Sequence, residues 1–361
     1  MEFGLSEEQV LLQDSVSKFL EGASDIEQVR QALDGKGDDS LWQGLNELGA
    51  NAALVPEEYD GMGLSLLDAA LIQEMLGRFV VPAAFAANAM ATTALVASGT
   101  EGQKRTWLPK IADGSARFGI AVSERTGARE GADVTDNDGK LTGKALFVTG
   151  FEGATDFIVA DNLGKLHMVS ADAAGLTKAN LPTIDKTRLV GELKFDNVQA
   201  HHLSTENEPG KAADRVIAAG RILAAADTLG AGTRMIEKAV DYARERKQFN
   251  RIIGSFQAVK HLCAEMAAEL EPCRSLVWYA AHAFDTVPEE ASLMACHAKS
   301  HLSEVGQFVA RTSTEVHGGV GFTDLMGLHF WFKRIGLNRQ LYGGPERVRD
   351  EAARLQGWVS T

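Results

Sequence analysis

The stretch AVDYARERKQFNRIIGSFQ, residues 239–257, decides how the rest of this chain is interpreted. It begins as the end of a helix, because Ile236, Val240 and Ala243 recur at helical spacing and form one apolar stripe. A basic cluster at 244–247 then occupies the last turn, where cations suit the negative end of the helix dipole. The aromatic and aliphatic residues that follow cross a short loop into another helix. The segment is either a helix end with a hydrophobic staple or an anion-binding cluster, since an Arg fork can pair two phosphate oxygens.

The composition is that of a globular protein that does not bind nucleic acid. The chain has 361 residues, of which 45% are hydrophobic and 24% charged, and its formal net charge is −13. This length supports two or three domains with a buried core, and the negative charge mainly aids solubility. No apolar run reaches the roughly 18 residues that span a bilayer. The opening MEFGLSEEQ lacks the basic and apolar regions of a signal peptide, so we expect no membrane contact and a cytoplasmic location.

The metal-binding residue types are not at ligand spacing. Three cysteines, Cys263, Cys273 and Cys296, lie in apolar helical stripes without a CxxC pair, which predicts buried, reduced thiols. His317 lies in a glycine-rich turn, and the pair His201–His202 is expected in a loop. We therefore expect no metal site.

The apolar periodicity changes twice along the chain. It is helical at first, with a capping box expected from Ser6 and Gln9 and a third helix expected over 65–78. Near Arg117 the period becomes two, and Asp138–Gly139 is a typical hairpin turn between strands. Helical stripes return at about residue 211 and continue to the end, which predicts three long antiparallel helices. We therefore expect an α+β multidomain protein: an N-terminal α-helical domain (1–116), a middle antiparallel β-sandwich or barrel (117–210) and a C-terminal helical bundle (211–361).

The motifs in this order resemble those of the acyl-CoA dehydrogenase family of flavoproteins. Residues 246–257, RKQFNRIIGSFQ, are similar to the family signature RKxFGxxIxxFQ, with Asn250 at the family's Gly. The helical, β, helical layout is also that of the family along the full chain. The resemblance implies that Arg246, Phe249 and Gln257 contact the FAD of a neighbouring subunit.

Three further strings carry the resemblance to the flavin site. The loop from Ala121 to Asp133 resembles the family's TEPGAGSD loop and places Ser123 against the isoalloxazine ring. The string LFVTG at 146–150 resembles the strand WITN, with Phe147 for its Trp and Thr149 for the hydroxyl near flavin N5. The string EVHGGVGFT at 315–323 resembles QxxGGxGF, whose glycines let the backbone approach FAD. The residues implied by this last string are Glu315, Gly318 and Gly319.

The family's catalytic base has no counterpart at either of its known positions. Most members carry a Glu in a YEGT motif, and the corresponding string here, LYGG, places Gly343 at that position. A minority carry the Glu directly before a characteristic Arg, which the resemblance identifies as Arg221, on the substrate side of the site. The residue before it is Gly220. The nearest carboxylate, Glu346, follows Pro345 in what is expected to be the acidic first turn of a helix.

These residues leave three interpretations of function. In the first, the chain is the base-lacking subunit of a heteromeric FAD-dependent acyl-CoA dehydrogenase, paired with a related subunit that carries the Glu. In the second, it is an active homo-oligomeric dehydrogenase with a relocated base. In the third, it is a flavin-dependent oxygenase or a structural partner of the same fold. The family implies an acyl-CoA substrate, α,β-desaturation and electron-transferring flavoprotein as the acceptor.

Overall fold

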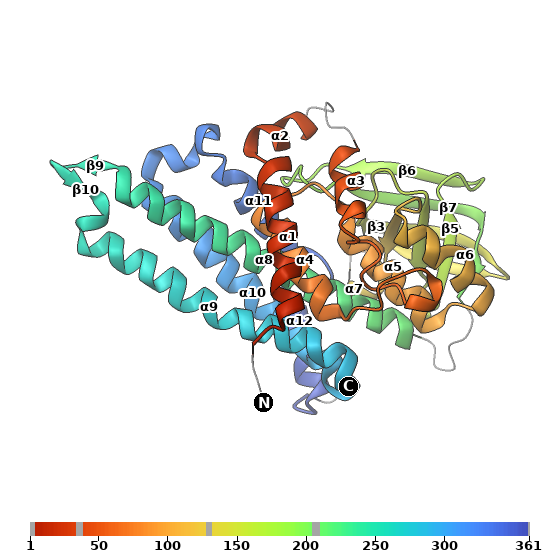
Figure 1. The fold of residues 1–361 in the computed structure, drawn as a ribbon. Coiled ribbons are helices and arrows are strands. Elements are labelled where there is room, and N and C mark those ends of the chain that lie inside the picture. Colours follow the sequence, from red (N-terminus) through yellow and green to blue (C-terminus); the bar gives the residue numbers. More distant parts are fainter. Residues whose placement is uncertain (1–3, 34–38, 128–131, 204–209, 360–361) are drawn as a thin grey trace.

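The computed structural model of the protein describes residues 4–33, 39–127, 132–203 and 210–359. Helices come first, strands occupy the middle of the chain, and helices return after Gly210. This is the expected fold class, with a helical N-terminal part, two β-sheets and a C-terminal helical bundle (Figure 1).

The N-terminal part is an all-helical layer that packs against the long helices of the C-terminal part. Ser6 caps the first helix through the predicted capping box with Gln9. The third predicted helix begins after Ser65 and ends at Arg78, as expected. It is buried on nearly every side, including Gln73 and Glu74, because it packs against four other helices. The helices are α1 (Glu7–Ala23), α2 (Ile26–Gln31), α3 (Ser40–Glu47), α4 (Leu66–Arg78), α5 (Phe85–Ser98) and α6 (Glu101–Ala112).

The middle of the chain forms two four-stranded sheets that pack face to face. One sheet has the order β2-β3-β7-β6 and is antiparallel throughout, and the predicted Asp138–Gly139 turn joins β2 to β3. The other has the order β1-β4-β5-β8. The strands are β1 (Phe118–Ala121), β2 (Asp133–Asn137), β3 (Lys140–Val148), β4 (Asp156–Ala160), β5 (Leu166–Ser170), β6 (Leu176–Leu181), β7 (Val190–Gln199) and β8 (His201–His202).

The second sheet differs from the expectation in two ways. Its β1 and β4 pair in parallel, whereas the other pairs are antiparallel. These two strands are buried at every position, since one face packs on the first sheet and the other on the helices. Alternation therefore could not identify their inner face. The pair His201–His202 was wrongly expected in a loop: it pairs with β5 and forms the edge of the sheet.

The C-terminal part is the expected bundle of three long helices, α8 (Lys211–Glu245), α9 (Gln257–Thr286) and α10 (Pro288–His317). Two shorter helices, α11 (Leu328–Gln340) and α12 (Pro345–Leu355), close it, and Pro345 stands at the first position of α12 as predicted. The RKQF string forms a small hairpin of β9 (Lys247–Gln248) and β10 (Arg251–Ile252). Figure 1 shows this hairpin at one end of the molecule and the two large sheets at the other.

The apolar character of the helices does not reach that of a membrane span. Within the described ranges, no helix is both long and apolar enough to cross a bilayer. The cysteines are unpaired; Cys273 and Cys296 are buried as predicted, but Cys263 is only half-buried.

Candidate functional site

Two cavities lie where the sheets meet the helices, and they share a wall. The first, about 670 Å³, lies between the start of α5, the middle of α8 and the loop between β6 and β7. The second, about 570 Å³, lies between the short helix α7 (Ser123–Thr126), the end of β3 and the α11–α12 junction. Thr183, Leu341 and Tyr342 line both cavities. Both volumes are in the usual range of small-molecule sites.

Tyr342 forms the centre of the shared wall. Its phenol hydroxyl lies 3.0 Å from the hydroxyl of Thr149, and the two groups form a buried hydrogen bond. Its backbone φ of +58° is unusual for a residue with a side chain and fixes the turn between α11 and α12. Burial raises the pKa of Tyr342, so the phenol is neutral at physiological pH. The Thr149 hydroxyl therefore already has a polar partner that the sequence motif did not reveal.

The three predicted flavin-site residues of the β domain lie close together. Ser123 begins α7, and its hydroxyl oxygen accepts a hydrogen bond of 3.0 Å from the backbone N–H of Leu146. Phe147 follows with a φ of +53° and remains 37% exposed in the second cavity. Thr149 lies at the wall between the cavities. Residues 128–131 of the predicted flavin loop lie outside the described part of the chain.

The remaining predicted FAD contacts lie at the opposite end of the bundle. Phe249 is 87% exposed at the tip of the β9–β10 hairpin. From Gly220, beside the first cavity, to Glu245, at the base of the hairpin, α8 advances about 37 Å at 1.5 Å per residue. One chain therefore does not bring the two groups together. The other residues of this distal group are also exposed: Arg246, Gln257, Glu315, Gly318 and Gly319.

The distal group is nevertheless one surface. Tyr242, near the end of α8, stacks on His317 with ring centroids 4.7 Å apart, which joins the hairpin base to the glycine-rich turn. Gly318 has a φ of +63°, and a Cβ at Gly318 or Gly319 would meet nothing within 4 Å. The backbone of that turn is therefore open to a ligand or to another subunit.

A side chain is disfavoured at both positions that the resemblance assigns to a catalytic Glu, by backbone conformation at Gly343 and by the end of the Met90 side chain at Gly220. Gly343 has a φ of +103°, and a Cβ there would lie 3.1 Å from a methyl of Val348 and 3.6 Å from a guanidinium nitrogen of Arg221. A Cβ on Gly220 would lie 2.6 Å from the terminal methyl of Met90. A side chain at either place would strain the backbone or displace its neighbours.

The side chain of Arg221 is held in place by hydrogen bonds to other residues of the chain. It is 2% exposed and pairs with both carboxylate oxygens of Glu351, at 2.8 and 2.7 Å. Its Nε–H donates to the backbone carbonyl of Tyr342 at 3.0 Å, and its Nη1 lies 3.2 Å from the sulfur of Cys296. Such a bidentate pair fixes both partners in orientation. Arg221 therefore anchors the turn that carries Tyr342 and Gly343.

The carboxylates near the two cavities differ in their surroundings. Glu346 is exposed and pairs with Arg339 at 2.9 Å. A backbone hydrogen bond at the start of α12 and then Arg339 lower its pKa, which makes it a weak proton acceptor. Asp185 lines the first cavity but accepts hydrogen bonds from the backbone N–H and the hydroxyl of Thr187, at 2.9 and 2.6 Å. Glu152 also lines that cavity and is exposed.

A buried ionic network lies beside the first cavity, which two of its members, Gln73 and Arg188, help to line, and sequence reasoning missed it. At its centre, Asp227 of α8 is fully buried and accepts hydrogen bonds of 2.9 and 2.7 Å from the guanidinium of Arg334. Gln73 of α4 donates to the same carboxylate at 2.6 Å, and Asn338 of α11 donates at 2.7 Å. The available signal was a lone acidic residue within the apolar run ILAAADTLG of α8.

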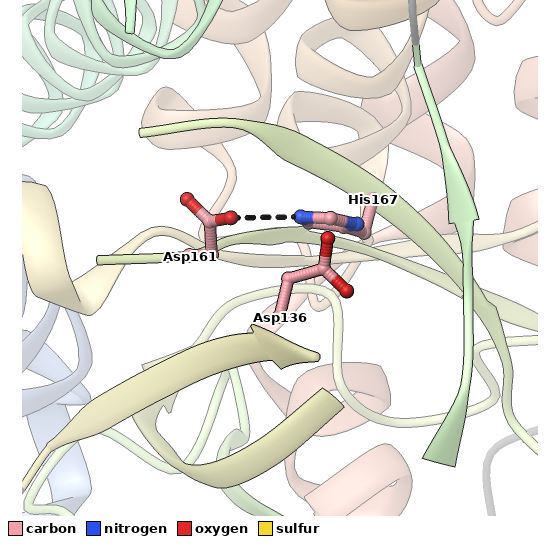
Figure 2. A group of neighbouring side chains, drawn as sticks. All are labelled: Asp136, Asp161 and His167. Atoms are coloured by element: carbon pink, nitrogen blue, oxygen red, sulfur yellow. Dashed lines mark hydrogen bonds and ion pairs between the residues drawn. The ribbon is translucent and has the colours of Figure 1, made fainter. Parts of the chain in front are cut away.

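A second polar group lies in the β domain, where the half-buried Asp136 and the buried Asp161 and His167 place one potential ligand atom each within 4.8 Å of one another (Figure 2). One oxygen of Asp161 accepts the backbone N–H groups of Leu163 and Lys165, and the other lies 3.1 Å from His167 Nε2. These bonds fix the turn between β4 and β5. The prediction that the chain binds no metal remains a prediction.

Comparison with known proteins gives matches along most of the chain. The family model for the acyl-CoA dehydrogenase N-terminal domain matches residues 6–115, and the model for the C-terminal domain matches residues 210–355. Acyl-CoA dehydrogenase IpdE2 of Mycobacterium tuberculosis is 31% identical over 345 residues, which cover 95% of each chain. IpdE2 of Mycolicibacterium smegmatis is 28% identical, over 98% of this chain and 100% of its own.

Among solved structures, one described as "Tcur3481-Tcur3483 steroid ACAD G363A variant" has a TM-score of 0.88 and 27% identity, over 98% of both chains. The chain therefore belongs to the acyl-CoA dehydrogenase family of flavin oxidoreductases. This confirms the resemblance inferred from the RKQF and GGVGF strings.

Proposed function

We propose that this chain is the base-lacking subunit of a heteromeric, FAD-dependent acyl-CoA dehydrogenase that desaturates an acyl-CoA thioester between its α and β carbons. The observation that carries the proposal is the environment of Gly343. Its φ of +103° and the contacts that a Cβ would make with Val348 and Arg221 disfavour a Glu there. At Gly220 the neighbouring space is taken by Met90.

The second cavity fits the ring system of a flavin. Its walls include Leu146, Phe147, Leu337 and Leu341, which suit a flat apolar ring, and Arg347, whose charge suits an electron-rich edge. Ser123 lies in the same wall. When bound, the flavin supplies a hydride acceptor for the β-carbon of the substrate. Residues of this chain would hold its ring system and exclude water from it.

The distance between the cavities and the exposed hairpin supports a role for a second subunit. The distal group of Arg246, Phe249 and Gln257 is exposed, about 37 Å along α8 from the cavities. We infer that it contacts the FAD held mainly by a neighbouring subunit, and that the neighbour's hairpin returns the contact. In a heteromer the related subunit also supplies the carboxylate that removes the α-proton, and electron-transferring flavoprotein then reoxidises the flavin.

The solved relative supports a heteromer of two different chains. Its description pairs two chain names, Tcur3481 and Tcur3483, with a steroid substrate class. The first cavity of the present chain is of a size that accepts a bulky acyl group, at about 670 Å³.

The second candidate is an active homo-oligomeric dehydrogenase whose base has moved. Asp185 and Glu152 favour it, because both line the first cavity. Asp185 would have to give up its hydrogen bonds from Thr187 to accept a proton, whereas Glu152 is exposed and would have to turn inward.

Anaerobic absorbance spectroscopy distinguishes the two candidates. The chain is expressed alone and with a related subunit, and each preparation is titrated with a panel of acyl-CoA thioesters. We expect the flavin band to bleach only in the co-expressed preparation. Bleaching by the isolated chain would refute the base-lacking role, and loss of that bleaching in Asp185→Asn or Glu152→Gln would identify the relocated base.

A further inference from the structure

The lining of the first cavity suits an apolar ligand of considerable size. Four alanines at or just before the start of α5 line one side, and Leu223 and Ala224 of α8 line another. Side chains this small leave about 670 Å³ open, which is room for a branched or cyclic acyl group. The lining favours an uncharged group, because its charged residues are two acids and two bases: Glu152, Asp185, Lys186 and Arg188.

The first cavity lacks a carboxylate placed to take a proton from such a ligand. Among the described residues that line it, only Asp185 and Glu152 carry a carboxylate. Asp185 is 1% exposed and accepts hydrogen bonds from the backbone N–H and the hydroxyl of Thr187, at 2.9 and 2.6 Å, whereas Glu152 is exposed. Both positions that the resemblance assigns to a base are glycine. An acyl group in this cavity therefore has no carboxylate of this chain to remove its α-proton.

Tyr342 stands between the first cavity and the second. It lines both cavities, and the hydrogen bond of 3.0 Å to the Thr149 hydroxyl holds its phenol ring in place. Nonbonded carbon atoms approach to about 3.5 Å, so two ligands on opposite sides of a phenol ring lie roughly 7 Å apart. Hydride transfer needs the reacting atoms about 3–3.5 Å apart. A ligand in the first cavity is therefore too far from a flavin in the second cavity to be oxidised.

We propose that the first cavity binds a branched or cyclic acyl-CoA thioester without oxidising it, and that Tyr342 separates this thioester from the flavin cavity. The inference rests on the proposed function for the thioester and for the related subunit, in whose own cavity the oxidation takes place. Each pair of unlike subunits then has two acyl sites, of which one turns its ligand over and one only holds it.

The first experiment counts the acyl sites. The probe is a 3-thia-acyl-CoA with a cyclohexyl end, because the sulfur at its β position carries no hydrogen to transfer. Its binding to the full chain, purified with its co-expressed partner, is measured by equilibrium dialysis, and we expect two sites per pair of unlike subunits. Ala86→Trp, which puts a large side chain into the first cavity, should leave one site. Ala174→Trp makes the same substitution at an exposed turn of the β domain and should leave two.

The second experiment tests the separation by Tyr342, through the change in flavin absorbance when the same probe saturates the complex. Tyr342→Gly removes the phenol ring without straining the turn, because a φ of +58° suits glycine, whereas Tyr342→Phe keeps a ring and lacks only the hydroxyl. The absorbance change should be about twofold larger in Tyr342→Gly than in wild type, because ligands at both sites then come within contact distance of a flavin. It should not increase in Tyr342→Phe.

Each failure has a distinct meaning. Ala83→Phe fills the same cavity and serves if Ala86→Trp does not fold, as judged by thermal unfolding. One site in the wild type, two sites that persist in the cavity-filling variant, or equal absorbance changes in wild type and Tyr342→Gly would overturn the inference and leave the proposed function standing. A complex that binds no probe at all would overturn both.

Discussion

Replacing Asp227 by Asn should destabilise the protein strongly, because Asp227 is the centre of the buried network. The substitution preserves shape and removes one negative charge. Arg334, fully buried, would lose the carboxylate that it binds at 2.7 and 2.9 Å. The new amide NH₂ would also face donors from Gln73 and Asn338. A buried cation without a counterion is among the costliest defects in a protein interior.

The magnitude follows from the burial and the chain length. Removing one member of a buried ion pair costs about 3–5 kcal/mol. At roughly 2.1 cal/mol/K per residue, the unfolding entropy of the 361-residue chain is about 0.76 kcal/mol/K. The expected fall in Tm is therefore about 4–7 °C for a cooperative transition.

The loss of stability caused by Asp227→Asn should depend on pH in a defined way. Burial alone would raise the pKa of Asp227, but Arg334 and Arg188 outweigh it and hold the pKa well below its usual range. A lowered folded pKa contributes stability that is complete above the unfolded pKa, about 3.9, and is lost as the pH falls through the folded value. The difference between wild type and Asp227→Asn should be constant from pH 8 to pH 5 and shrink below about pH 4.

The assay is thermal unfolding followed by circular dichroism, with two controls. Asp350→Asn makes the same substitution in an exposed ion pair with Arg354 and should cost under about 1 kcal/mol. Asp227→Asn combined with Arg334→Met removes both buried charges and should recover part of the loss. If Asp227→Asn lowers Tm no more than Asp350→Asn does, the network does not stabilise the fold as argued.

Three further predictions follow from the geometry. Gly343→Glu should lower Tm by about 1–4 °C, because a side chain at a φ of +103° costs about 1–3 kcal/mol. The variant should not restore acyl-CoA-dependent flavin bleaching by the chain alone, and bleaching would contradict the assigned geometry. Phe249→Ala should lower the association constant of the subunits about tenfold or more, as measured by light scattering. The circular dichroism spectrum should not change, because Phe249 is exposed. An unchanged association constant would exclude the exposed hairpin from the interface. Burial lowers the pKa of Lys299 to about 7. Above pH 7 the Lys299 amine is therefore mostly neutral in the folded chain, whereas it is still protonated in the unfolded chain. The unfolding free energy of wild type relative to Lys299→Met should therefore rise from pH 7 to pH 8.5 in urea titrations, and a constant difference would show that Lys299 is not desolvated.

The three-part architecture could be predicted because each part has its own apolar period. Helical stripes, the Ser6 capping box and the Asp138–Gly139 turn are local signals, and the structure confirms them. Local signals failed where an element is buried on several sides. Strands β1 and β4 lack alternation, and α4 buries Gln73 together with its apolar residues.

The site was only partly predictable, because its decisive contacts join distant parts of the chain. The strings containing Ser123, Phe147 and Thr149 were recognisable, and the structure places these residues around the cavities. The pairing of Arg221 with Glu351 spans 130 positions and has no spacing signature. The same holds for the hydrogen bond between Thr149 and Tyr342, 193 positions apart. The first pair arises from the packing of α12 near α8, and the second from the packing of the α11–α12 turn on the end of β3. No local pattern encodes either arrangement.

The length of α8 affects how the sequence of such a chain can change during evolution. The helix keeps the cavities and the exposed hairpin about 37 Å apart, so the two ends can be altered independently. Mutations at sites this far apart are expected to act independently, so a change that abolishes chemistry at one end should leave the other intact. In the proposed assembly, a duplicated copy that lost its own turnover would still be indispensable to its sister copy, and selection would preserve the hairpin while the cavity drifted toward a new ligand.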